Sequence, residues 1–388
     1  MIRLILLTDF TEAFPHNLLR GILRYAKEQS HEPWVACRMP PSFKDKYGIE
    51  GVLEWARNWG ANAIIGRFEN DDDVSIFRKN NIVALAQDFK QRFSGIPNIT
   101  SDYIKTGDMA ANFFLEKGFH NFAFYGYHNT VWSDERCAGF SHCINMAGYG
   151  DNFHSYKNLQ LDTLWFYDTS SLVDWLKSLP PRTALFCCDD NQGNKITEVC
   201  NFSNIRIPED IAVLGVDNDV TICNLSDPTL SSVNLDIERG GYDAASLITR
   251  MMRDPDLPSE DVVIQPTTIV NRASSNIYAT DDPYVLKALE YIHNNLYVPL
   301  SVPDVLRQLP LSRRLFEIRF KRVIGQSIYS YISGCRMELF ARLLHDSNKP
   351  VCDIAIDLGI NNYGNLIRQF RAVMGCTPTE YRTRHKTR

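Results

Sequence analysis

The feature that most constrains this fold is a change of periodicity near residue 270. Before it, short apolar runs rich in β-branched and aromatic residues alternate with amphipathic segments such as 17–29 and 106–117. The strand-like runs are 3–7, 63–66, 82–85, 122–125, 184–188 and 212–216. This alternation is typical of a parallel sheet covered by helices on both faces. There are too many such units for one small sheet, so we predict two α/β lobes.

The polar segment 271–283 marks the change. It has no apolar period and ends in an acidic pair before Pro283, which is typical of a linker followed by a helix start. After it, apolar residues recur with the period of an α-helix. The predicted helices are 283–296, 301–308, 312–323, 327–345, 351–358, 362–374 and 378–384. We therefore predict a two-lobed α/β domain over 1–272, a linker over 273–282 and an all-helical domain over 283–388.

Formal charge separates near the same boundary. The 388 residues carry a net charge of −5, but residues 280–388 hold four Lys and twelve Arg against ten Asp and Glu, a net +6. The residues before them therefore carry −11. A basic unit attached to an acidic one suits contact with nucleic acid through the basic part alone.

Several classes of protein are disfavoured. No run of about 18 apolar residues appears, so we expect no membrane-spanning helix. Asp9 interrupts the first apolar run too early for a secretion signal, so we expect a cytoplasmic protein. The ten cysteines show neither a C-x-x-C pair nor zinc-ligand spacing, which predicts free thiols and no metal or other cofactor. A catalytic thiol at Cys187 or Cys188 is the alternative, and no neighbouring residue supports it.

Two segments of the helical part share one layout, in which a short helix, a turn and a second helix follow one another. Ser312 and Asn362 open the two second helices with side chains that can cap them, and Gly359 can end the short helix before the latter. Apolar residues then recur at helical spacing and are predicted to face the core: Leu315, Phe316, Phe320, Val323, Leu366, Ile367, Phe370 and Val373. This layout predicts tandem helix-turn-helix units whose second helices enter the major groove.

The opposite face of each second helix is polar and basic. The candidate DNA-binding residues are Arg313, Arg314, Glu317, Lys321, Asn362, Asn365, Arg368 and Arg371. Those placed to reach base edges are Arg314, Glu317, Asn365 and Arg368. Those expected at phosphates are Lys321 and Arg371, with Arg382 and Arg384 of the tail. The alternative is that these helices only present a solvated basic face.

The same helices resemble the arabinose-regulator family of transcription factors. The matching motifs are SRRLFEIRFKRVIG at 312–325, RMELFARLL at 336–344, DIAIDLG at 353–359 and GCTPTEYR at 375–382. The resemblance covers residues 283–384 and implies a DNA-binding domain built from two helix-turn-helix units joined by a long helix.

Polar and aromatic side chains follow four of the predicted strands. A ligand of a parallel sheet binds at the carboxyl ends of its strands, where this chain has Asp9, Phe10, Phe14, Trp132, Glu135, Arg136, Asp189, Asp190, Asp217 and Asn218. Carboxylates and Arg make charge-assisted hydrogen bonds to hydroxyls, and aromatic rings cover the C–H faces of a sugar. This combination predicts a sugar or polyol site.

Other interpretations of these residues stay open. Asp189 and Asn218 could be helix caps only, and Phe10 and Phe14 could be core residues. Arg136 could form a structural ion pair with a loop carboxylate, either Asp190 or Asp217. An enzyme is a further alternative, with Asp189 and Asp190 as an acid/base or metal-binding pair, although no G-x-G-x-x-G, P-loop or G-x-S-x-G motif accompanies them.

A second resemblance concerns the α/β part. The motif R-x-x-G-F at 136–140, the run IPEDIAVLGVDN at 207–218 and LSSV at 230–233 resemble the lactose-repressor and periplasmic sugar-binding fold. The resemblance implies that Arg136 and Asp217 contact the effector. In the repressors a DNA-binding headpiece comes first, whereas here the predicted DNA-binding part follows the sensor. That order, with an arabinose-regulator tail, resembles the family of xylose-operon regulators and implies D-xylose as effector.

The sequence therefore predicts a sugar-responsive transcription regulator, an activator of pentose (D-xylose) catabolism genes. Its expected partners are promoter half-sites in double-stranded DNA, a second copy of the chain and RNA polymerase. The alternatives are a regulator that responds to a different sugar or polyol, and a repressor.

Overall fold

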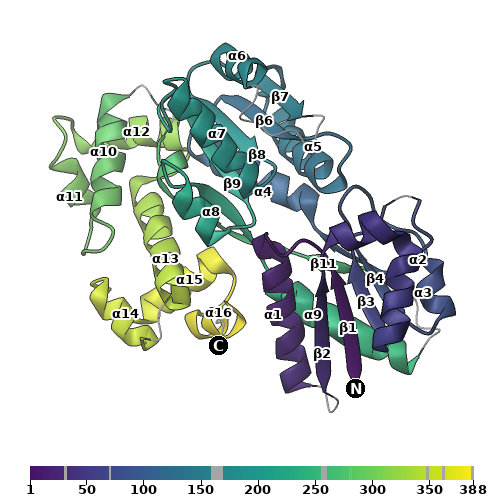
Figure 1. Ribbon diagram of the computed structural model, residues 1–388. Helices are drawn as coiled ribbons and strands as arrows, with labels where there is room; N and C mark the ends of the chain where they lie inside the picture. Colours follow the sequence, from purple (N-terminus) through teal and green to yellow (C-terminus); the bar gives the residue numbers. More distant parts are fainter. Residues whose placement is uncertain are drawn as a thin grey trace. The chain divides into compact units, whose positions relative to one another are not determined.

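The computed structural model describes residues 1–29, 33–69, 71–158, 169–254, 260–278, 280, 282–346, 349–360 and 363–385. The chain divides into two compact units, one formed by residues 1–115 and 120–277 and the other by residues 116–119 and 278–388 (Figure 1). Within the described ranges, no helix combines the length and the apolarity that crossing a bilayer requires.

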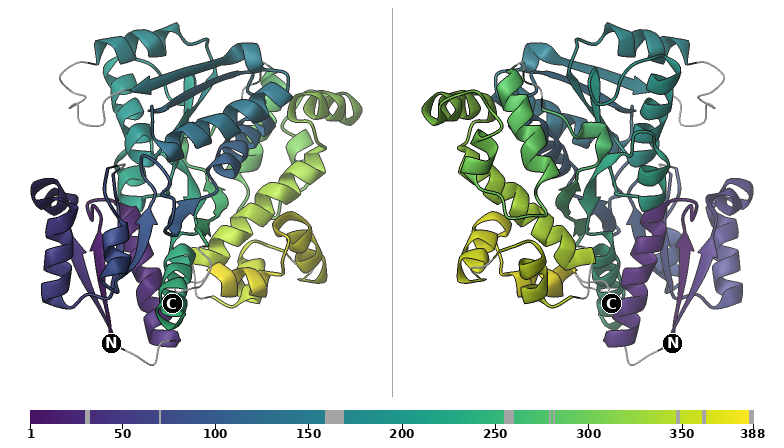
Figure 2. Two further views of the ribbon diagram at one scale, coloured as in Figure 1. Left: turned by 90° about the vertical axis from the view of Figure 1, so that its right-hand side faces the viewer. Right: turned by 90° about the vertical axis from the view of Figure 1, so that its left-hand side faces the viewer.

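The first sheet of the larger unit is entirely parallel, with the order β11-β5-β4-β3-β1-β2. Its strands are β1 (Ile2–Leu7), β2 (Trp34–Met39), β3 (Ala63–Gly66), β4 (Val83–Gln87), β5 (Asn98–Ser101) and β11 (Val262–Ile264). The helices are α1 (Ala13–Glu28), α2 (Pro41–Trp59), α3 (Ser75–Lys79) and α9 (Ile237–Arg253). Helices α1 and α9 pack together (Figure 2) so closely that a Cβ on Gly241 would lie 2.0 Å from the Leu18 carbonyl oxygen.

The second sheet has the order β12-β10-β9-β8-β6-β7, and only its β10–β12 pair is antiparallel. Its strands are β6 (Asn121–Tyr127), β7 (Phe153–Asn158), β8 (Thr183–Cys187), β9 (Ile211–Val216), β10 (Ser231–Leu235) and β12 (Pro266–Val270). The helices between them are α4 (Tyr103–Glu116), α5 (Val131–Met146), α6 (Ser170–Ser178), α7 (Asp190–Phe202) and α8 (Val220–Leu225). Strands β8 and β9 are buried along their whole length, which explains their continuous apolar sequence.

The chain passes between the two sheets three times, after β5, after β10 and after β11. The prediction of two α/β lobes is therefore confirmed, and all six predicted strands are present. Six further strands were not predicted. Two of these, β2 and β7, are edge strands with partly exposed side chains. The sequence of β7, FHSYKN, lacks a continuous apolar run, whereas β2 has one at 34–37 (WVAC) that was not predicted as a strand.

The first residues of the predicted linker pack against the second sheet. Ala273–Ser275 forms a short 3-10 helix in which both serines are fully buried. The Ser274 hydroxyl donates to the Val213 carbonyl oxygen at 2.7 Å, and the Ser231 amide donates to the Ser274 hydroxyl at 2.9 Å. Buried polar side chains need hydrogen-bond partners, and these serines find theirs on the second sheet. The larger unit therefore continues to Ile277.

The smaller unit is helical, as predicted. Its helices are α10 (Pro283–Asn294), α11 (Val302–Leu306), α12 (Arg313–Ile324), α13 (Ile328–Asp346), α14 (Val351–Asp357), α15 (Tyr363–Met374) and α16 (Pro378–His385). They enclose an aromatic core, in which Phe320 contacts Tyr331 and Phe370 contacts both Phe340 and Tyr381 with ring centroids 5.5–5.6 Å apart. The long α13 thus connects the α11–α12 pair with the α14–α15 pair through one core.

Candidate functional site

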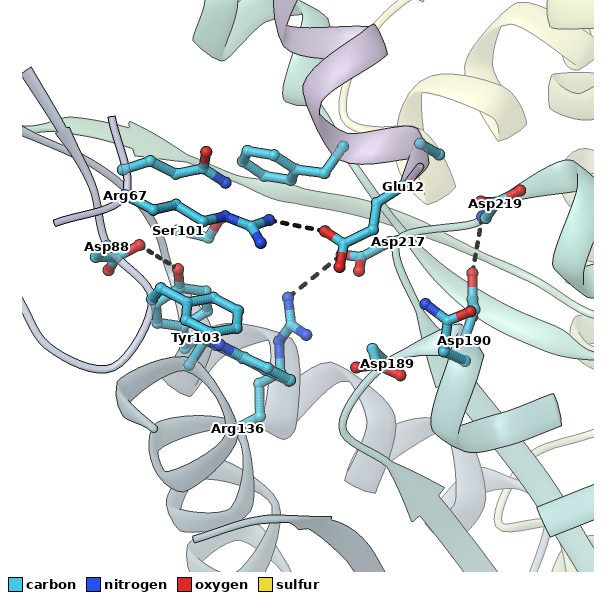
Figure 3. Close-up of a pocket in the computed structure, with 16 residues that line it drawn as sticks. Glu12, Arg67, Asp88, Ser101, Tyr103, Arg136, Asp189, Asp190, Asp217 and Asp219 are labelled. Atoms are coloured by element: carbon cyan, nitrogen blue, oxygen red, sulfur yellow. Dashed lines mark hydrogen bonds and ion pairs between the residues drawn. The ribbon is translucent and has the colours of Figure 1, made fainter. Parts of the chain in front are cut away.

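A pocket of about 720 Å³, including its open mouth, lies in the larger unit at the ends of strands from both sheets (Figure 3). Its lining residues are Glu12, Ala13, Phe14, Arg67, Gln87, Asp88, Phe89, Ser101, Tyr103, Trp132, Arg136, Asp189, Asp190, Asn191, Asp217 and Asp219. Each of them stands at or just beyond the carboxyl end of β1, β3, β4, β5, β6, β8 or β9. This is the place where open parallel sheets bind ligands.

Arg136 is the central cation of the pocket. It comes from the second turn of α5 and is almost completely buried. Its guanidinium lies over the rings of Tyr103 and Trp132, 5.3 and 5.4 Å from their centroids. It also donates to the Cys188 carbonyl oxygen and lies 3.4 Å from Oδ1 of Asp217. Aromatic faces stabilise a guanidinium held out of water, so this side chain is fixed in place before any ligand arrives.

Three aspartates of the second sheet line the pocket together with this arginine. Asp189 caps α7, where its Oδ1 accepts from the Gln192 amide at 2.7 Å. Asp190 accepts from the Asp219 amide at 2.7 Å. Asp217 occupies a positive-φ position (99°) directly after β9. Burial raises the pKa of all three carboxyls, that of Asp189 to about 7, because removal from water disfavours the charged form.

The first sheet contributes a second set of charges. Arg67 follows β3 and donates to Glu12 at 2.7 Å, with its guanidinium 4.6 Å from the Phe89 ring centroid. Asp88, at the end of β4, accepts from the Tyr103 hydroxyl at 2.7 Å and from Thr100 Oγ1 at 2.5 Å. Burial raises the pKa of Asp88 to about 6. Figure 3 shows Arg67 and Arg136 reaching into the pocket from different elements.

The balance of charges indicates the kind of ligand. Six carboxyl groups line the pocket against two guanidinium groups, so an anionic ligand would be repelled. Arg67 and Arg136 each keep a buried Nε that has no hydrogen-bond partner within the described part of the chain. A neutral molecule with several hydroxyls could accept from these donors and donate to the carboxylates. The rings of Phe14, Phe89, Tyr103 and Trp132 provide apolar faces for its C–H groups.

Six of the predicted ligand-binding residues line the pocket: Phe14, Trp132, Arg136, Asp189, Asp190 and Asp217. The other three lie outside the lining and have partners of their own. Asp9 accepts from the amide and hydroxyl of Thr11, Glu135 forms a two-point ion pair with Arg92, and Asn218 accepts from Arg272 at 2.7 Å.

Phe10, considered beside Phe14 in the sequence, contacts His16 and Arg38 rather than the pocket. Asp189 shows that the two interpretations of a strand-end carboxylate are compatible, since it both caps a helix and lines the pocket. Arg136 likewise lies beside Asp217 and also lines the pocket.

Apart from Phe14, the pocket residues of the first sheet were not predicted from the sequence. Arg67 and Asp88 directly follow two strands that were predicted, so the strand-end rule would have identified them had it been applied there. Ser101 is the last residue of β5 and Tyr103 follows it; this four-residue strand, with the sequence NITS, carries no apolar run. No local signal points to these two residues.

The buried cysteines do not support a thiol nucleophile. Cys187 and Cys188 are fully buried, and burial raises the pKa of both thiols well above the usual range. A thiol of this kind stays protonated and unreactive near neutral pH. Among the described residues, no cluster of His, Cys, Asp and Glu is arranged to hold a metal ion.

The second site is formed by α12 and α15 of the smaller unit. The Ser312 hydroxyl accepts from the Leu315 amide at 3.4 Å and so caps α12, as predicted. Gly359 takes a positive φ of 65° after α14, also as predicted. Asn362 lies outside the described residues. Each second helix follows a short helix and a turn, which is the helix-turn-helix arrangement.

The outward faces of α12 and α15 carry most of the predicted DNA-binding residues. Arg314, Lys321, Arg368 and Arg371 are exposed. Glu317 is held by Arg313 of the same helix at 2.8 Å, and Asn365 accepts from Arg368 at 2.9 Å. Arg382 of the tail is half-buried and donates to the Leu344 carbonyl oxygen at 3.4 Å, so part of its side chain serves the core.

Two apolar residues predicted to face the core do not do so. Leu315 is 44% exposed and Val373 is 47% exposed, whereas Phe316, Phe320, Leu366 and Phe370 are buried. The prediction was wrong for these two because successive helical residues turn by about 100°. Four apolar residues per helix therefore span more arc than the neighbouring helices cover.

Comparison with known proteins identifies both parts of the chain. Residues 111–275 match a periplasmic binding protein-like domain, and residues 305–384 match a helix-turn-helix domain. The Xylose operon regulatory protein of Escherichia coli K12 is 26% identical over 98% of this chain and 96% of its own length. The protein of the same name from Haemophilus influenzae is 29% identical over 83% of this chain and 84% of its own.

Solved structures show the same fold. The structure of a xylose-binding transcription activator aligns with 99% of this chain and 98% of its own, with a TM-score of 0.60 and 24% identity. A LacI family transcriptional regulator from Enterococcus faecium with bound ribose aligns with 71% of this chain and 98% of its own, with a TM-score of 0.57 and 19% identity. The predicted fold class is confirmed.

The comparisons also confirm the order of the two functional parts. A periplasmic binding protein-like domain precedes a helix-turn-helix domain, and the Xylose operon regulatory proteins match this chain across both domains. The chain is a DNA-binding transcription regulator, and the relatives that match it over most of its length are xylose operon regulatory proteins.

Proposed function

We propose that the pocket binds a neutral sugar, D-xylose first among them, and that the bound sugar makes the chain an activator of pentose catabolism genes. The observation that carries this proposal is the pocket itself, in which six carboxyls, two arginines and four aromatic rings surround one space. The names of the full-length relatives, which are xylose operon regulatory proteins, select xylose among neutral polyols.

Each wall of the pocket has a distinct role in this proposal. Arg136 and Asp217 hold one hydroxyl pair of the sugar from the second sheet, with Asp189 and Asp190 beside them. Arg67 and Asp88 hold hydroxyls from the first sheet. Trp132 and Phe14 cover the C–H face of the ring. Because these groups belong to both sheets, a sugar that contacts all of them selects the arrangement of the lobes in which they converge.

The outlying predicted residues have supporting roles in the proposal. Asp9 holds the turn between β1 and α1, and the Glu135–Arg92 ion pair lies one residue before Arg136 on α5. Asn218 connects the end of β9 to β10 through Ser232 and Asn234. Each of them positions a neighbour that lines the pocket.

The helical unit supplies DNA binding. Helices α12 and α15 would enter adjacent major grooves of a promoter half-site, with Arg314 and Arg368 at base edges and Lys321 and Arg371 at phosphates. We further propose that the protein acts as a homodimer on repeated half-sites, that it contacts RNA polymerase, that it works in the cytoplasm and that it binds sugar without turnover. Symmetric regulators commonly read repeated sites in this way.

Thermal unfolding of the full chain with a panel of D-xylose, L-arabinose, D-ribose, D-glucose and xylitol tests the ligand. A ligand that binds only the folded state raises the melting temperature, and we expect the largest rise with D-xylose. Calorimetry should then show saturable binding and no continuing heat of reaction. A rise with another member of the panel alone would replace xylose by that sugar, and product formation would show an enzyme.

In vitro transcription from a xylose-operon promoter separates activator from repressor. An activator gives more transcript when the sugar is added to protein and polymerase. A repressor instead gives less transcript without sugar than polymerase alone gives. Sedimentation of the same sample, with and without sugar, tests the dimer.

A further inference from the structure

The solvent-facing side of α12 carries exposed apolar side chains that are flanked by basic ones. Ile318 is 59% exposed and Leu315 is 44% exposed. At about 100° per residue, Ile318 points away from the side of the helix that buries Phe316 and Phe320. Arg314 and Arg322 flank Ile318 one turn before and one turn after it, and both are exposed. A branched apolar side chain therefore occupies the middle of the face that would enter the groove.

The polar neighbours of this centre are engaged elsewhere. The Glu317 carboxylate is held by Arg313 at 2.8 Å, and Arg319 donates to Asp282 at 3.1 Å. Of the exposed cations on α12, Arg313 is paired with Glu317, whereas Arg314, Lys321 and Arg322 have no ion pair with another described residue. The polar groups of α12 thus surround Ile318 and Leu315 without covering them.

The equivalent face of α15 is chemically different. Both helices end at a glycine with positive φ, Gly325 at 80° and Gly375 at 72°, and both bury a phenylalanine five residues earlier. In this common register Arg368 of α15 stands where α12 has Ile318, and Asn365 stands where α12 has Leu315. One helix thus presents hydrogen-bonding groups at the two positions where the other presents apolar ones.

We infer that Ile318 and Leu315 read thymine through its 5-methyl group, whereas Arg368 and Asn365 read bases by hydrogen bonds. The inference deepens the proposed DNA-binding function and rests on it. In the major groove the thymine methyl is the apolar feature of the base edges, while the other exposed groups are donors and acceptors. Burial of a methyl against Ile318 removes apolar surface from water on both partners. Arg322, one turn after Ile318, meets a phosphate, whose charge complements its own.

Uracil substitution tests this directly, because uracil lacks only the methyl of thymine. Duplexes that bind the full chain are first selected from a random library, with and without D-xylose. Each thymine of the selected site is then replaced by uracil, and affinity is measured for the wild type, Ile318→Ala, Leu315→Ala and Arg368→Ala. We expect loss of one methyl at the thymine under α12 to lower wild-type affinity about four-fold, the effect of burying one methyl-sized group.

The variants locate the contact. Ile318→Ala should bind the thymine duplex more weakly and lose most of the response to that uracil, and Leu315→Ala should do the same at the same or the next thymine. Arg368→Ala should keep the full uracil response. Ile356→Ala, which truncates another exposed isoleucine on α14 (69% exposed, against 59% for Ile318), is the matched control and should behave as wild type.

Three results overturn the inference. In the first, the wild type binds equally well when uracil replaces any thymine. In the second, Ile318→Ala and Leu315→Ala both lose affinity on uracil substitution as the wild type does. In the third, it is Arg368→Ala that abolishes this loss of affinity. The affinities of the wild type for the uracil-substituted duplexes test the inference even if a variant misfolds. Failure to enrich any duplex would contradict the proposed DNA-binding function itself, and it is distinguishable because it precedes every substitution.

Discussion

The charged groups of the pocket come from distant parts of the sequence, whereas those of α12 and of α15 each come from one short segment. The pocket draws side chains from seven strand ends, so residues as distant as Glu12 and Asp219 meet in one space, and many of them are buried. Each reading helix draws its groups from a stretch of 12 residues, most of them exposed. Water screens the charges on the two helices, whereas it is largely excluded from the charges in the pocket.

This difference predicts how each region responds to change. A buried charge that loses its partner is destabilised strongly, because no water replaces the lost interaction. An exposed charge loses little by itself, and its effect depends on the salt concentration. We therefore expect few, large effects in the pocket and several small, salt-dependent effects on α12 and α15.

The largest effect is expected at Asp217. Asp217→Asn keeps the size of the side chain and the tolerance of positive φ, but it removes the charge beside Arg136. We expect sugar affinity to fall by about 2–5 kcal/mol, since truncating one partner of a buried charged pair has that effect. Calorimetry with the sugar that gives the largest thermal shift measures the loss.

DNA binding without sugar should be unchanged in Asp217→Asn. Asp243→Asn is the matched control, because it neutralises a carboxylate of the same unit that is paired with Arg239 at the surface. If both variants bind sugar as the wild type does, Asp217 is not a ligand-binding residue.

The next effect is expected at Arg368. Arg368→Ala should weaken binding to the selected duplex by about 1–3 kcal/mol and relax the preference at one base pair, as expected for an arginine that reads a base edge. Sugar affinity should stay at the wild-type value. Arg206→Ala removes an exposed arginine of the other unit, paired with Asp210, and serves as the control. Uniform weakening on all sequences would instead place Arg368 at a phosphate.

A smaller effect concerns pH. Burial raises the pKa of Asp189 to about 7 and that of Asp88 to about 6, so both carboxyls are partly protonated in the empty pocket near pH 6. Sugar hydroxyls that donate to these oxygens favour the ionised form. Sugar affinity should therefore rise with pH between 6 and 8, by at most about ten-fold per pH unit for one titrating group.

Asp189→Asn should flatten this pH profile while preserving the helix cap, since Asn is also a good capping residue. The free energy of unfolding should instead fall as pH rises. A raised carboxyl pKa contributes stability that is fully present below about pH 4 and is lost as pH rises through the folded value. Wild-type affinity that does not change between pH 6 and 8 would show that the sugar binds the protonated and ionised pocket equally.

The smallest effect is expected at Lys321. Lys321→Ala should weaken binding to every duplex to a similar extent and lower the slope of log affinity against log salt by about one. Affinity measured at several salt concentrations gives the slope. A preference that changes at one base pair, with the slope unchanged, would assign Lys321 to base reading instead.

Prediction from sequence was strongest where structure is local. The helices of the second unit were placed within a few residues, because each buries a stripe of apolar residues with a period of 3.6 and begins or ends at a capping residue such as Ser312 or Gly359. Buried parallel strands such as β8 were found for the same reason, since their continuous apolar run is a property of the segment alone.

Other features depend on distant residues and could not be predicted in this way. The neighbours of Asp189 in the pocket are determined by the order of strands in two sheets and by three passages between them, and a polar strand such as β5 gives no local signal. Likewise, the exposure of Leu315 and Ile318 depends on how much of α12 the adjacent helices cover. These are results of packing between distant segments.

The sequence by itself therefore determined the order of the two parts, the helices of the second part, six buried strands of the first part and six of the pocket residues. The tertiary structure decided which strand ends meet, which carboxylates face Arg136 and which apolar side chains of α12 point to solvent. The physical reason is that periodicity and capping act between residues a few positions apart, whereas a pocket and an exposed face result from contacts between segments that only folding brings together.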